Sequence, residues 1–323
     1  GQEKAEINAR TRLGIKMLQN PLEPGVPSAP LPAGQDGKFN AEELLGVIWN
    51  NRSWYAEQFL PELLERCDAI GTTAVGGQDL SSWCQSLENW DGLYNRDSVG
   101  AHIFRVFMAN YLEDVNTDLT QPFSPSDPVG TPASPSEDNA GTPDDTMLLA
   151  LSAGVDALVS QGIAPTTALG DLQYYRASGG VVPGSGDMPV FQTVEIPWHG
   201  GDGSIDGAFN AIGVVSEPFA EDTRFPRIAP PTIPNTAGLS DGSNGIDGWL
   251  MARGTSWHFG LEFTDNGPEA YGLVSYSQST DAMSDYFSDQ SVQYSNKESR
   301  KLLFTEDEIE ANLLPQGETV ISQ

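Results

Sequence analysis

Basic residues are scarce in this sequence. Among 323 residues, Lys and Arg together number 16, whereas Asp and Glu number 45, and the formal net charge is −29. Proteins that bind nucleic acids neutralise phosphates with clustered Lys and Arg, and anionic membrane surfaces attract the same residues. The sequence contains no such cluster, so its composition argues against a nucleic-acid partner and against a membrane partner.

A long apolar run is also absent. No segment reaches the roughly 18 apolar residues that a transmembrane helix needs, and the opening residues, Gly-Gln-Glu-Lys, do not resemble the start of a secretion signal. Either the protein is cytoplasmic or this chain does not begin at the natural start. Hydrophobic residues still make up 38% of the chain, which is enough for the core of about two domains or one large one.

Cysteine is limited to Cys67 and Cys84. The pair lacks the CxxC spacing and the histidine partners of a zinc site. A disulfide between them would close a short loop and contribute about 3 kcal/mol in the chain-entropy model. We therefore expect a disulfide, which would imply an oxidising compartment. Two buried free thiols are the alternative.

Histidine is equally rare, and no catalytic constellation surrounds the three that are present. We interpret His102, in a helical stretch, as structural. Ser256 and His258 imitate a nucleophile elbow, but an elbow needs Gly two residues after Ser, at a strand-to-helix turn. This segment has the pattern of a strand and no acid to orient the histidine. A metallohydrolase that uses His199 and Asp202 is a further possibility.

A glycine-rich segment at 201–207 imitates two ligand-binding loops. Asp-Gly-Ser-Ile-Asp-Gly at 202–207 resembles the start of a calcium loop, but the twelfth position, which needs Glu, is Gly213. The glycine spacing also misses the GxGxxG phosphate pattern. We expect no metal or organic cofactor, and a contact with an ion outside the EF-hand pattern is the alternative.

Residues 1–165 have mainly helical patterns. We expect helices over 2–18, 40–64, from about 79, from 97 to 111, and over 144–161. Asn40 with Glu43 predicts a capping box, and Pro61 should start a new helical turn rather than lie within a helix. Asp97 and either Asp144 or Asp145 are the expected caps of later helices. The proline-rich stretch 118–145 predicts a surface excursion or linker.

Residues 166–323 have the pattern of strands and turns. We expect strands over 191–196, 209–215, 249–252, 257–263 and 270–276. Asp265-Asn266-Gly267 is a hairpin signal, so the last two strands should pair antiparallel. Thr305 and Glu308 predict the capping box of a final short helix. The fold class is therefore α+β, with a helix-rich first half and an antiparallel strand-rich second half.

Several motifs occur in the order found in one known family. In chain order they are NARTRLG (8–14), NWDG (89–92), DSVGA (97–101) with FR (104–105), LGDLQY (169–174), IPWHGG (196–201) with GAFN (207–210), GTS (254–256) with YSQS (276–279), DQ (289–290) and YS (294–295), and LLFT (302–305). Together they resemble the penicillin acylase-type N-terminal-nucleophile hydrolases, in the branch of acyl-homoserine-lactone and aculeacin acylases.

This resemblance implies that the chain is the C-terminal part of a β-subunit and forms part of an αββα sandwich. In such enzymes the precursor cleaves itself, and the new β-chain begins with a serine that attacks the amide. The α-amino group of that serine acts as the base, and a backbone N–H with an asparagine side chain forms the oxyanion hole. The chemistry needs no cofactor.

The sequence departs from the family pattern at Gly1, which has no nucleophilic side chain. The segment with the oxyanion asparagine, which precedes RTRLG in the family, is also absent. We therefore expect the nucleophile and this asparagine outside the chain. The expected partners are the rest of the β-chain, the α-chain and an acyl-amide substrate, and the expected location is periplasmic or secreted.

The resemblance also implies an arginine that supports the oxyanion site. Arg10 is the candidate and Arg12 is second, whereas surface or salt-bridge roles for both are the alternative. A different function, a non-catalytic acidic secreted binding module, would also suit this composition.

Overall fold

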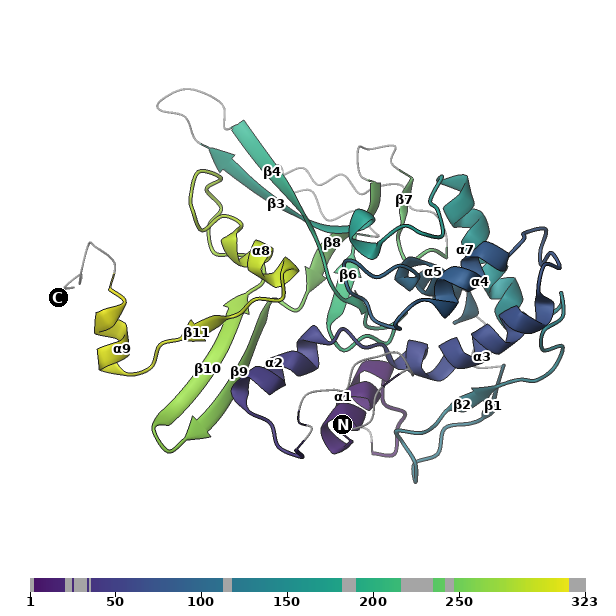
Figure 1. Ribbon diagram of the computed structural model, residues 1–323, viewed down its shortest axis with the longest axis horizontal. Coiled ribbons are helices and arrows are strands. Elements are labelled where there is room, and N and C mark those ends of the chain that lie inside the picture. Colours follow the sequence, from purple (N-terminus) through teal and green to yellow (C-terminus); the bar gives the residue numbers. More distant parts are fainter. Residues whose placement is uncertain are drawn as a thin grey trace.

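Several helices pack together at one end of an elongated molecule, and most of the strands, with a few further helices, lie toward the other end (Figure 1). The structure, a computed structural model, describes residues 3–20, 25, 34, 36–112, 118–181, 190–215, 235–241 and 247–313. Helices α3 (Trp54–Ile70), α4 (Ser81–Glu88), α5 (Ala101–Tyr111) and α7 (Thr146–Ser160) form one end, which we call the helical end, and most of the strands extend from it in two sheets. The observed mixture confirms the α+β class, and the division into parts 1–165 and 166–323 stays a prediction.

The helices have the following bounds: α1 Ala9–Gln19, α2 Ala41–Trp49, α3 Trp54–Ile70, α4 Ser81–Glu88, α5 Ala101–Tyr111, α7 Thr146–Ser160, the 3-10 helix η1 Leu169–Asp171, α8 Asp289–Ser295 and α9 Glu306–Ala311. The strands are β1 Leu119–Gln121, β2 Ala133–Pro135, β3 Gln173–Val181, β4 Val190–Pro197, β5 Gly201–Asp202, β6 Ala211–Val214, β7 Ser240–Asp241, β8 Asp247–Gly254, β9 Trp257–Thr264, β10 Gly267–Val274 and β11 Arg300–Leu302. Within the described ranges, no helix is both long enough and apolar enough to cross a membrane.

Local capping signals set several helix boundaries as the sequence predicts. Asn40 and Glu43 form the complete capping box of α2. Thr305 and Glu308 form the capping box of α9. Asp145, rather than Asp144, caps α7 by accepting hydrogen bonds from two backbone N–H groups. The predicted start of the first helix at residue 2 is wrong, because Asn8 caps the helix and holds its first turn at Ala9.

Two other boundary predictions are wrong. Pro61 lies inside α3, on the exposed side of the helix. Burial of Phe59, Leu60 and Leu63 on the other side holds the helix together. Asp97 does not cap α5, because that helix begins four residues later, at Ala101, with Gly100 at the N-cap position. A side chain at Gly100 would collide with Trp90, 2.6 Å from the position of a Cβ atom.

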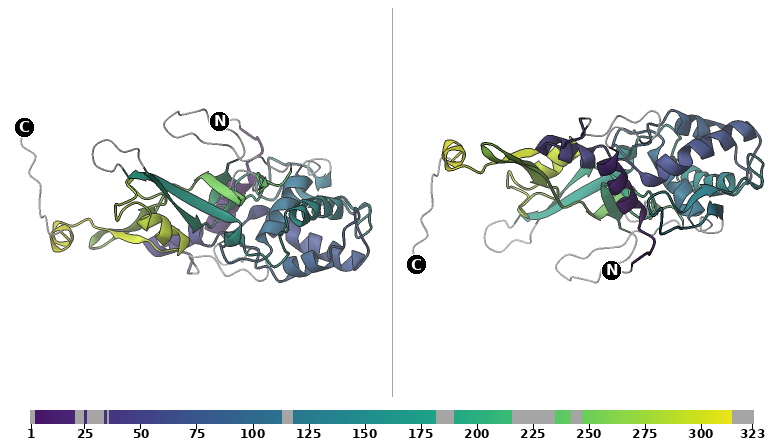
Figure 2. Two further views of the ribbon diagram at one scale, coloured as in Figure 1. Left: turned by 90° about the horizontal axis from the view of Figure 1, so that it is seen from above. Right: turned by 90° about the horizontal axis from the view of Figure 1, so that it is seen from below.

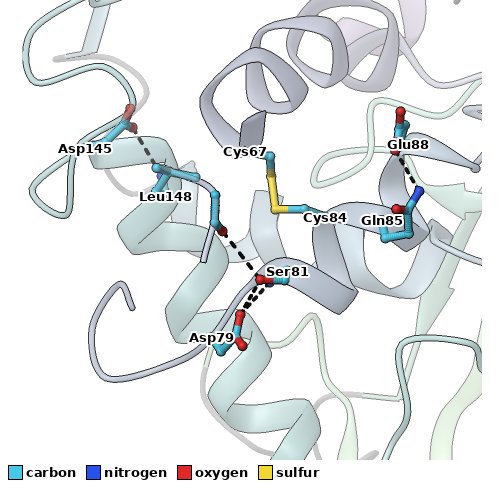
Figure 3. Close-up of a disulfide and its surroundings, with 9 residues drawn as sticks. Cys67, Asp79, Ser81, Cys84, Gln85, Glu88, Asp145 and Leu148 are labelled. Atoms are coloured by element: carbon cyan, nitrogen blue, oxygen red, sulfur yellow. Dashed lines mark hydrogen bonds between the residues drawn. A yellow bond between two sulfur atoms is a disulfide. The ribbon is translucent and has the colours of Figure 1, made fainter. Parts of the chain in front are cut away.

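The helical end contains the largest hydrophobic core. Apolar faces of α3, α4, α5 and α7 meet there, with Phe104, Phe107 and Tyr111 fully buried. A disulfide joins Cys67 of α3 to Cys84 of α4 (Figure 3). It confirms the expected pairing over the free thiols.

The proline-rich stretch 118–145 lies against the helices rather than linking two domains. Its short strands β1 and β2 pair antiparallel, and two buried arginines hold its backbone. Arg12 of α1 donates to the carbonyl groups of Val129 and Pro132, at 2.8 and 3.0 Å. Arg66 of α3 donates to the carbonyl of Ser136 at 2.6 Å. Part of the N-terminal helix is thus used to fix this excursion.

The strands after β2 form a six-stranded sheet and a three-stranded sheet. The larger has the order β4-β3-β8-β6-β5, with β7 beside β8, and the smaller has the order β11-β10-β9. Most pairs are antiparallel, although β3 with β8 and β5 with β6 are parallel. The β9–β10 hairpin pairs in the predicted way. Strand β3 and helix α8 were not predicted.

Helix α2 covers one face of the small sheet. The backbone oxygen of Ala41 lies only 1.8 Å from where a Cβ atom on Gly260 of β9 would be, so this close approach requires glycine. Leu45 and Trp49 of α2 share a core with Leu273 of β10 and Tyr294 of α8. This second core meets the helical end at the loops described next.

Candidate functional site

Four segments that are far apart in the sequence meet between the helical end and the strands. They are residues 50–53 before α3, 93–96 before α5, 198–210 after β4, and 294–297 at the end of α8. Polar side chains from all four are buried and bond to one another. We call this arrangement the junction network.

The first part of the junction network is centred on two asparagines. Nδ2 of Asn210 donates to Oδ1 of Asn51 at 2.8 Å and to the hydroxyl of Tyr294 at 2.7 Å. The side chain of Asn51 in turn donates to Oδ1 of Asn95 at 2.9 Å. The backbone carbonyl of Asn51 accepts the backbone N–H of Tyr94. Asn51 has a φ of 53°, a conformation that Asn tolerates better than most residues.

The second part is a buried ion pair. Nε of Arg105, on α5, donates to Oδ2 of Asp206 at 2.9 Å, and both side chains are at most 1% exposed. The other carboxylate oxygen accepts from the hydroxyl of Tyr94 at 2.9 Å. Arg105 also donates to Gln173 at 2.6 Å, and Gln173 donates to the carbonyl of Gly200 at 3.0 Å. The ion pair and the hydrogen bonds of Gln173 therefore connect α5, β3 and the loop after β4.

The third part surrounds His199. Its Nδ1 accepts the backbone N–H of Arg96 at 3.0 Å, and its Nε2 donates to the carbonyl of Ser295 at 2.8 Å. The guanidinium of Arg96 donates to the hydroxyl of Ser295 at 2.8 Å. Both ring nitrogens of His199 are therefore occupied, which fixes its neutral tautomer and leaves neither nitrogen to bind a metal.

Burial dominates the electrostatics of the junction network. It raises the pKa of the Asp206 carboxyl, an effect that the Arg105 guanidinium opposes. It raises the pKa of Tyr94 well above the ordinary value, with the Asp206 charge acting in the same direction. It lowers the pKa of His199 to about 4, with Lys297 adding to the shift. Tyr94 and His199 are therefore neutral near pH 7.

These groups hold the fold together rather than activate a nucleophile. In the part of the chain that the structure describes, no serine or threonine hydroxyl hydrogen-bonds to a histidine ring, and no group of three metal-ligating side chains occurs. One buried acceptor, Oδ1 of Asn210, has no partner among the described residues. The network positions backbone loops precisely, which a composite active site requires of its scaffold.

The two candidate arginines have different surroundings. Arg10 is exposed, its Nε donates to the carbonyl of Phe209 at 2.8 Å, and its guanidinium lies over the Phe209 ring. Arg12 is 4% exposed and lies 4.4 Å from the centre of the Trp54 ring, with its donors directed at the excursion. Arg10 therefore reaches the junction network through the loop that carries Asn210. A catalytic role for either arginine stays a prediction.

The remaining histidines are buried, and neither hydrogen-bonds to a serine hydroxyl among the described residues. His102 binds the carbonyl of Ala164 at 3.1 Å, as expected for a structural residue. His258 packs edge-on against Trp49, with ring centres 4.5 Å apart, whereas Ser256 is exposed. The imitation of a nucleophile elbow therefore does not form a catalytic pair.

The loop that imitates a calcium site uses its carboxylates internally. Oδ1 of Asp202 accepts the backbone N–H groups of Ser204 and Ile205, at 2.8 and 2.9 Å. Asp206 accepts the N–H of Asp202 at 2.6 Å in addition to its ion pair. The aspartates therefore cap a turn and anchor it to α5.

A pocket of about 350 Å³ lies beside the starting end of β3. It is lined by Gly170, Asp171, Tyr174, Glu195, Pro197 and Asp247. Arg176 pairs with Glu195 at 2.6 Å, and the other two carboxylates keep the pocket acidic. Such a lining disfavours a fatty-acid carboxylate.

Comparison with known proteins places these features in a family. The family model described as penicillin amidase matches residues 8–311. This chain belongs to the penicillin amidase family. Acyl-homoserine lactone acylase PvdQ of Pseudomonas savastanoi pv. phaseolicola is 28% identical over 280 residues, which cover 86% of this chain and 30% of that relative. Aculeacin-A acylase of Actinoplanes utahensis is 28% identical over 320 residues, which cover 97% of this chain and 33% of that relative.

The chain thus spans about a third of the length of the curated relatives that it matches. The family motifs supply much of the junction network, because FR, LGDLQY, IPWHGG, GAFN and YS contribute Arg105, Gln173, His199, Asn210, Tyr294 and Ser295. Sequence reasoning found these motifs but, apart from the metallohydrolase alternative at His199, assigned no role to these residues. It missed Asn51 and Tyr94 entirely, since neither lies in a motif.

Proposed function

We propose that this chain is the C-terminal β-chain portion of an amidohydrolase that cleaves acyl amides. The substrate class is an N-acyl-homoserine lactone or a related fatty-acyl amide. Membership of the penicillin amidase family supports amide hydrolysis, and the names of the relatives support an acylated substrate. The observation that carries the proposal is that family motifs far apart in the sequence meet in one buried network.

In this proposal the nucleophile is a serine at the start of the complete β-chain, outside the present chain. Its hydroxyl oxygen bonds to the amide carbon while its proton passes through its own α-amino group to the leaving nitrogen. The C–N bond breaks, the amine departs, and water hydrolyses the resulting ester to release the fatty acid. This is the chemistry of a nucleophile activated by an adjacent base.

The present chain contributes the scaffold of part of an αββα sandwich and an arginine near the oxyanion site. Arg10 is the better candidate because its Nη groups have no hydrogen-bond partner among the described residues, whereas Arg12 is engaged by two carbonyl groups. The disulfide supports assembly in the periplasm or outside the cell. The precursor would be processed by its own new serine.

The test is hydrolysis by the complete precursor. Purified protein is incubated with acyl-homoserine lactones of several chain lengths, with lipopeptide amides and with β-lactam amides, and released amines are quantified. We expect release from at least one acylated substrate and its loss when the N-terminal serine of the β-chain is replaced by alanine. If no substrate is hydrolysed by correctly processed protein, the proposal is wrong and a binding module becomes the better interpretation.

A further inference from the structure

One face of the β9–β10 hairpin carries no charged residue. The side chains at alternate positions of β9 share this face with their partners on β10, in the pairs Trp257 with Val274, Phe259 with Gly272, Leu261 with Ala270, and Phe263 with Pro268. We call these eight residues the apolar face. Such a set of uncharged residues is unusual in a chain with a formal net charge of −29. The third strand of the sheet adds one charge to this face, Arg300 of β11 opposite Gly272, and that charge is paired with Asp289.

The aromatic side chains of the apolar face are open to solvent. Trp257 is 49% exposed, Phe259 is 48% exposed and Phe263 is 81% exposed. Soluble proteins rarely leave contiguous aromatic residues uncovered, and such patches mark contacts with other polypeptides. The apolar face therefore needs a covering layer.

The opposite face of the same hairpin is covered by helix α2. Helix α2 approaches Gly260 so closely that no Cβ atom would fit, and Glu262 accepts the backbone N–H of Ala41 at 3.4 Å. Trp49 of α2 contacts His258. A sheet buried on one face by a helix and apolar on the other is the middle of a layered structure, with one layer missing.

The segment after β11 also exposes apolar side chains. Phe304 is 62% exposed, Ile309 is 46% exposed and Leu313 is 45% exposed. Helix α9 contains no buried residue, and a helix of six residues is not stable in water without packing. Both views of Figure 2 show α9 and the hairpin extending away from the helical end. The β9–β10 hairpin and the segment that contains α9 therefore both expose apolar side chains to solvent.

We propose that the apolar face is the docking surface for the part of the precursor polypeptide that this chain does not span. This inference rests on the proposed function, in which the chain is one portion of a larger acylase. The lengths of the relatives support this choice of partner, because about two thirds of each relative lies outside the matched region. A second copy of the chain fits less well, since each copy would bring another formal charge of −29.

The test uses the complete precursor, with single cysteines placed at Phe259→Cys and at Phe263→Cys. Val159→Cys on α7 is the matched control, because Val159 is 49% exposed and lies at the helical end. Each protein reacts with a maleimide before and after unfolding in urea, and the labelled peptides are quantified by mass spectrometry. Cys67 and Cys84 are already paired in a disulfide, so they do not compete for the reagent.

We expect both hairpin cysteines to react at least tenfold more slowly in the folded precursor than after unfolding, while the control reacts at similar rates in both. Reaction of the hairpin cysteines within threefold of the unfolded rate would overturn the proposal. Hydroxyl-radical oxidation of unmodified precursor at Trp257 and Phe263 gives the same answer if a variant fails to fold. Light scattering completes the test, because protection that disappears on dilution to monomers would assign the face to a second copy.

The same protein preparation is assayed for amide hydrolysis, which separates the two proposals. Protection without hydrolysis would leave the docking surface standing and remove the acylase function. Hydrolysis without protection would do the reverse.

Discussion

The side-chain amide of Asn210 donates a 2.8 Å hydrogen bond to Oδ1 of Asn51, a residue 159 positions earlier in the chain. Both side chains are at most 1% exposed, so neither can replace this bond with water. The bond ties the loop before α3 to the loop before β6. It is therefore one of the bonds of the junction network that join the helical end to the strands.

Replacement of Asn51 separates its backbone role from its side-chain role. Asn51→Gly keeps the positive φ accessible but removes two hydrogen bonds, and we expect a loss of about 1 to 3 kcal/mol in the free energy of unfolding. Asn51→Ala adds the strain of a left-handed backbone, so it should cost about 1 kcal/mol more. Urea unfolding of the complete protein measures both. Equal stability of the two variants would show that the backbone is not strained.

Removal of the buried carboxylate should be far more damaging than removal of an exposed one. Asp206→Asn leaves Arg105 buried without its counter-charge, and we expect a loss of about 3 to 5 kcal/mol. Glu195→Gln is the control, because Glu195 is 54% exposed in its pair with Arg176 and should cost at most about 1 kcal/mol. Thermal and urea unfolding report the difference. Similar losses in both variants would contradict the role assigned to the buried pair.

Loss of the disulfide should destabilise the helical end. A Cys67→Ser and Cys84→Ser double variant should lose about 3 kcal/mol according to the chain-entropy model for a loop of this length. A reducing agent should lower the melting temperature of the unmodified protein and leave that of the variant unchanged. An equal response of both proteins would place the reducible bond elsewhere.

Acid sensitivity should depend on His258. Burial lowers the pKa of this ring from 6.5 to about 4 in the folded protein. Between these values the unfolded chain binds more protons, so the free energy of unfolding falls as the pH decreases from about 6.5 to 4. His258→Phe removes this contribution without breaking a hydrogen bond to a described residue. Between pH 6.5 and 4, the free energy of unfolding of this variant should therefore fall by about 1 to 3 kcal/mol less than that of the unmodified protein. Urea titrations at several pH values measure the difference.

Replacement of Arg10 should affect activity, whereas replacement of Arg12 should affect stability. Arg10→Ala removes an exposed side chain that reaches the Asn210 loop, so we expect at least a tenfold loss of kcat/KM and a nearly unchanged melting temperature. Arg12→Ala removes two bonds to the excursion, so we expect lower stability and faster proteolysis within residues 118–145. If Arg10→Ala retains full activity, the exposed arginine does not support the site.

Sequence reasoning succeeded where the cause of a structure is local. The capping box of Asn40, the cap at Asp145 and the β9–β10 hairpin each depend on a few adjacent residues. Pro61 and Asp97 were misread because tertiary packing overrides their local preferences. Burial of apolar residues beside Pro61 keeps α3 continuous, and the approach of Trp90 to Gly100 determines where α5 begins.

The candidate site was less accessible to such reasoning. Its motifs could be located, but each hydrogen bond joins residues that are far apart, such as Arg105 with Asp206 or Arg96 with Ser295. Strand β3 was missed because its glycines and polar residues at 173–181 lack a clear alternation. Pairing with β4 and β8 makes this segment a strand, and no local pattern encodes that pairing.

The junction network also sets a time constraint on synthesis. Tyr294, which completes the bonds of Asn210, follows Asn51 by about 240 residues, and a ribosome adds about 5 to 20 residues per second. Once Asn51 has been made, the junction network therefore waits roughly 10 to 50 seconds for Tyr294. During that interval its polar groups and the adjoining apolar helices must remain unpaired or bind a chaperone, so the junction can close only after Tyr294 has been synthesised.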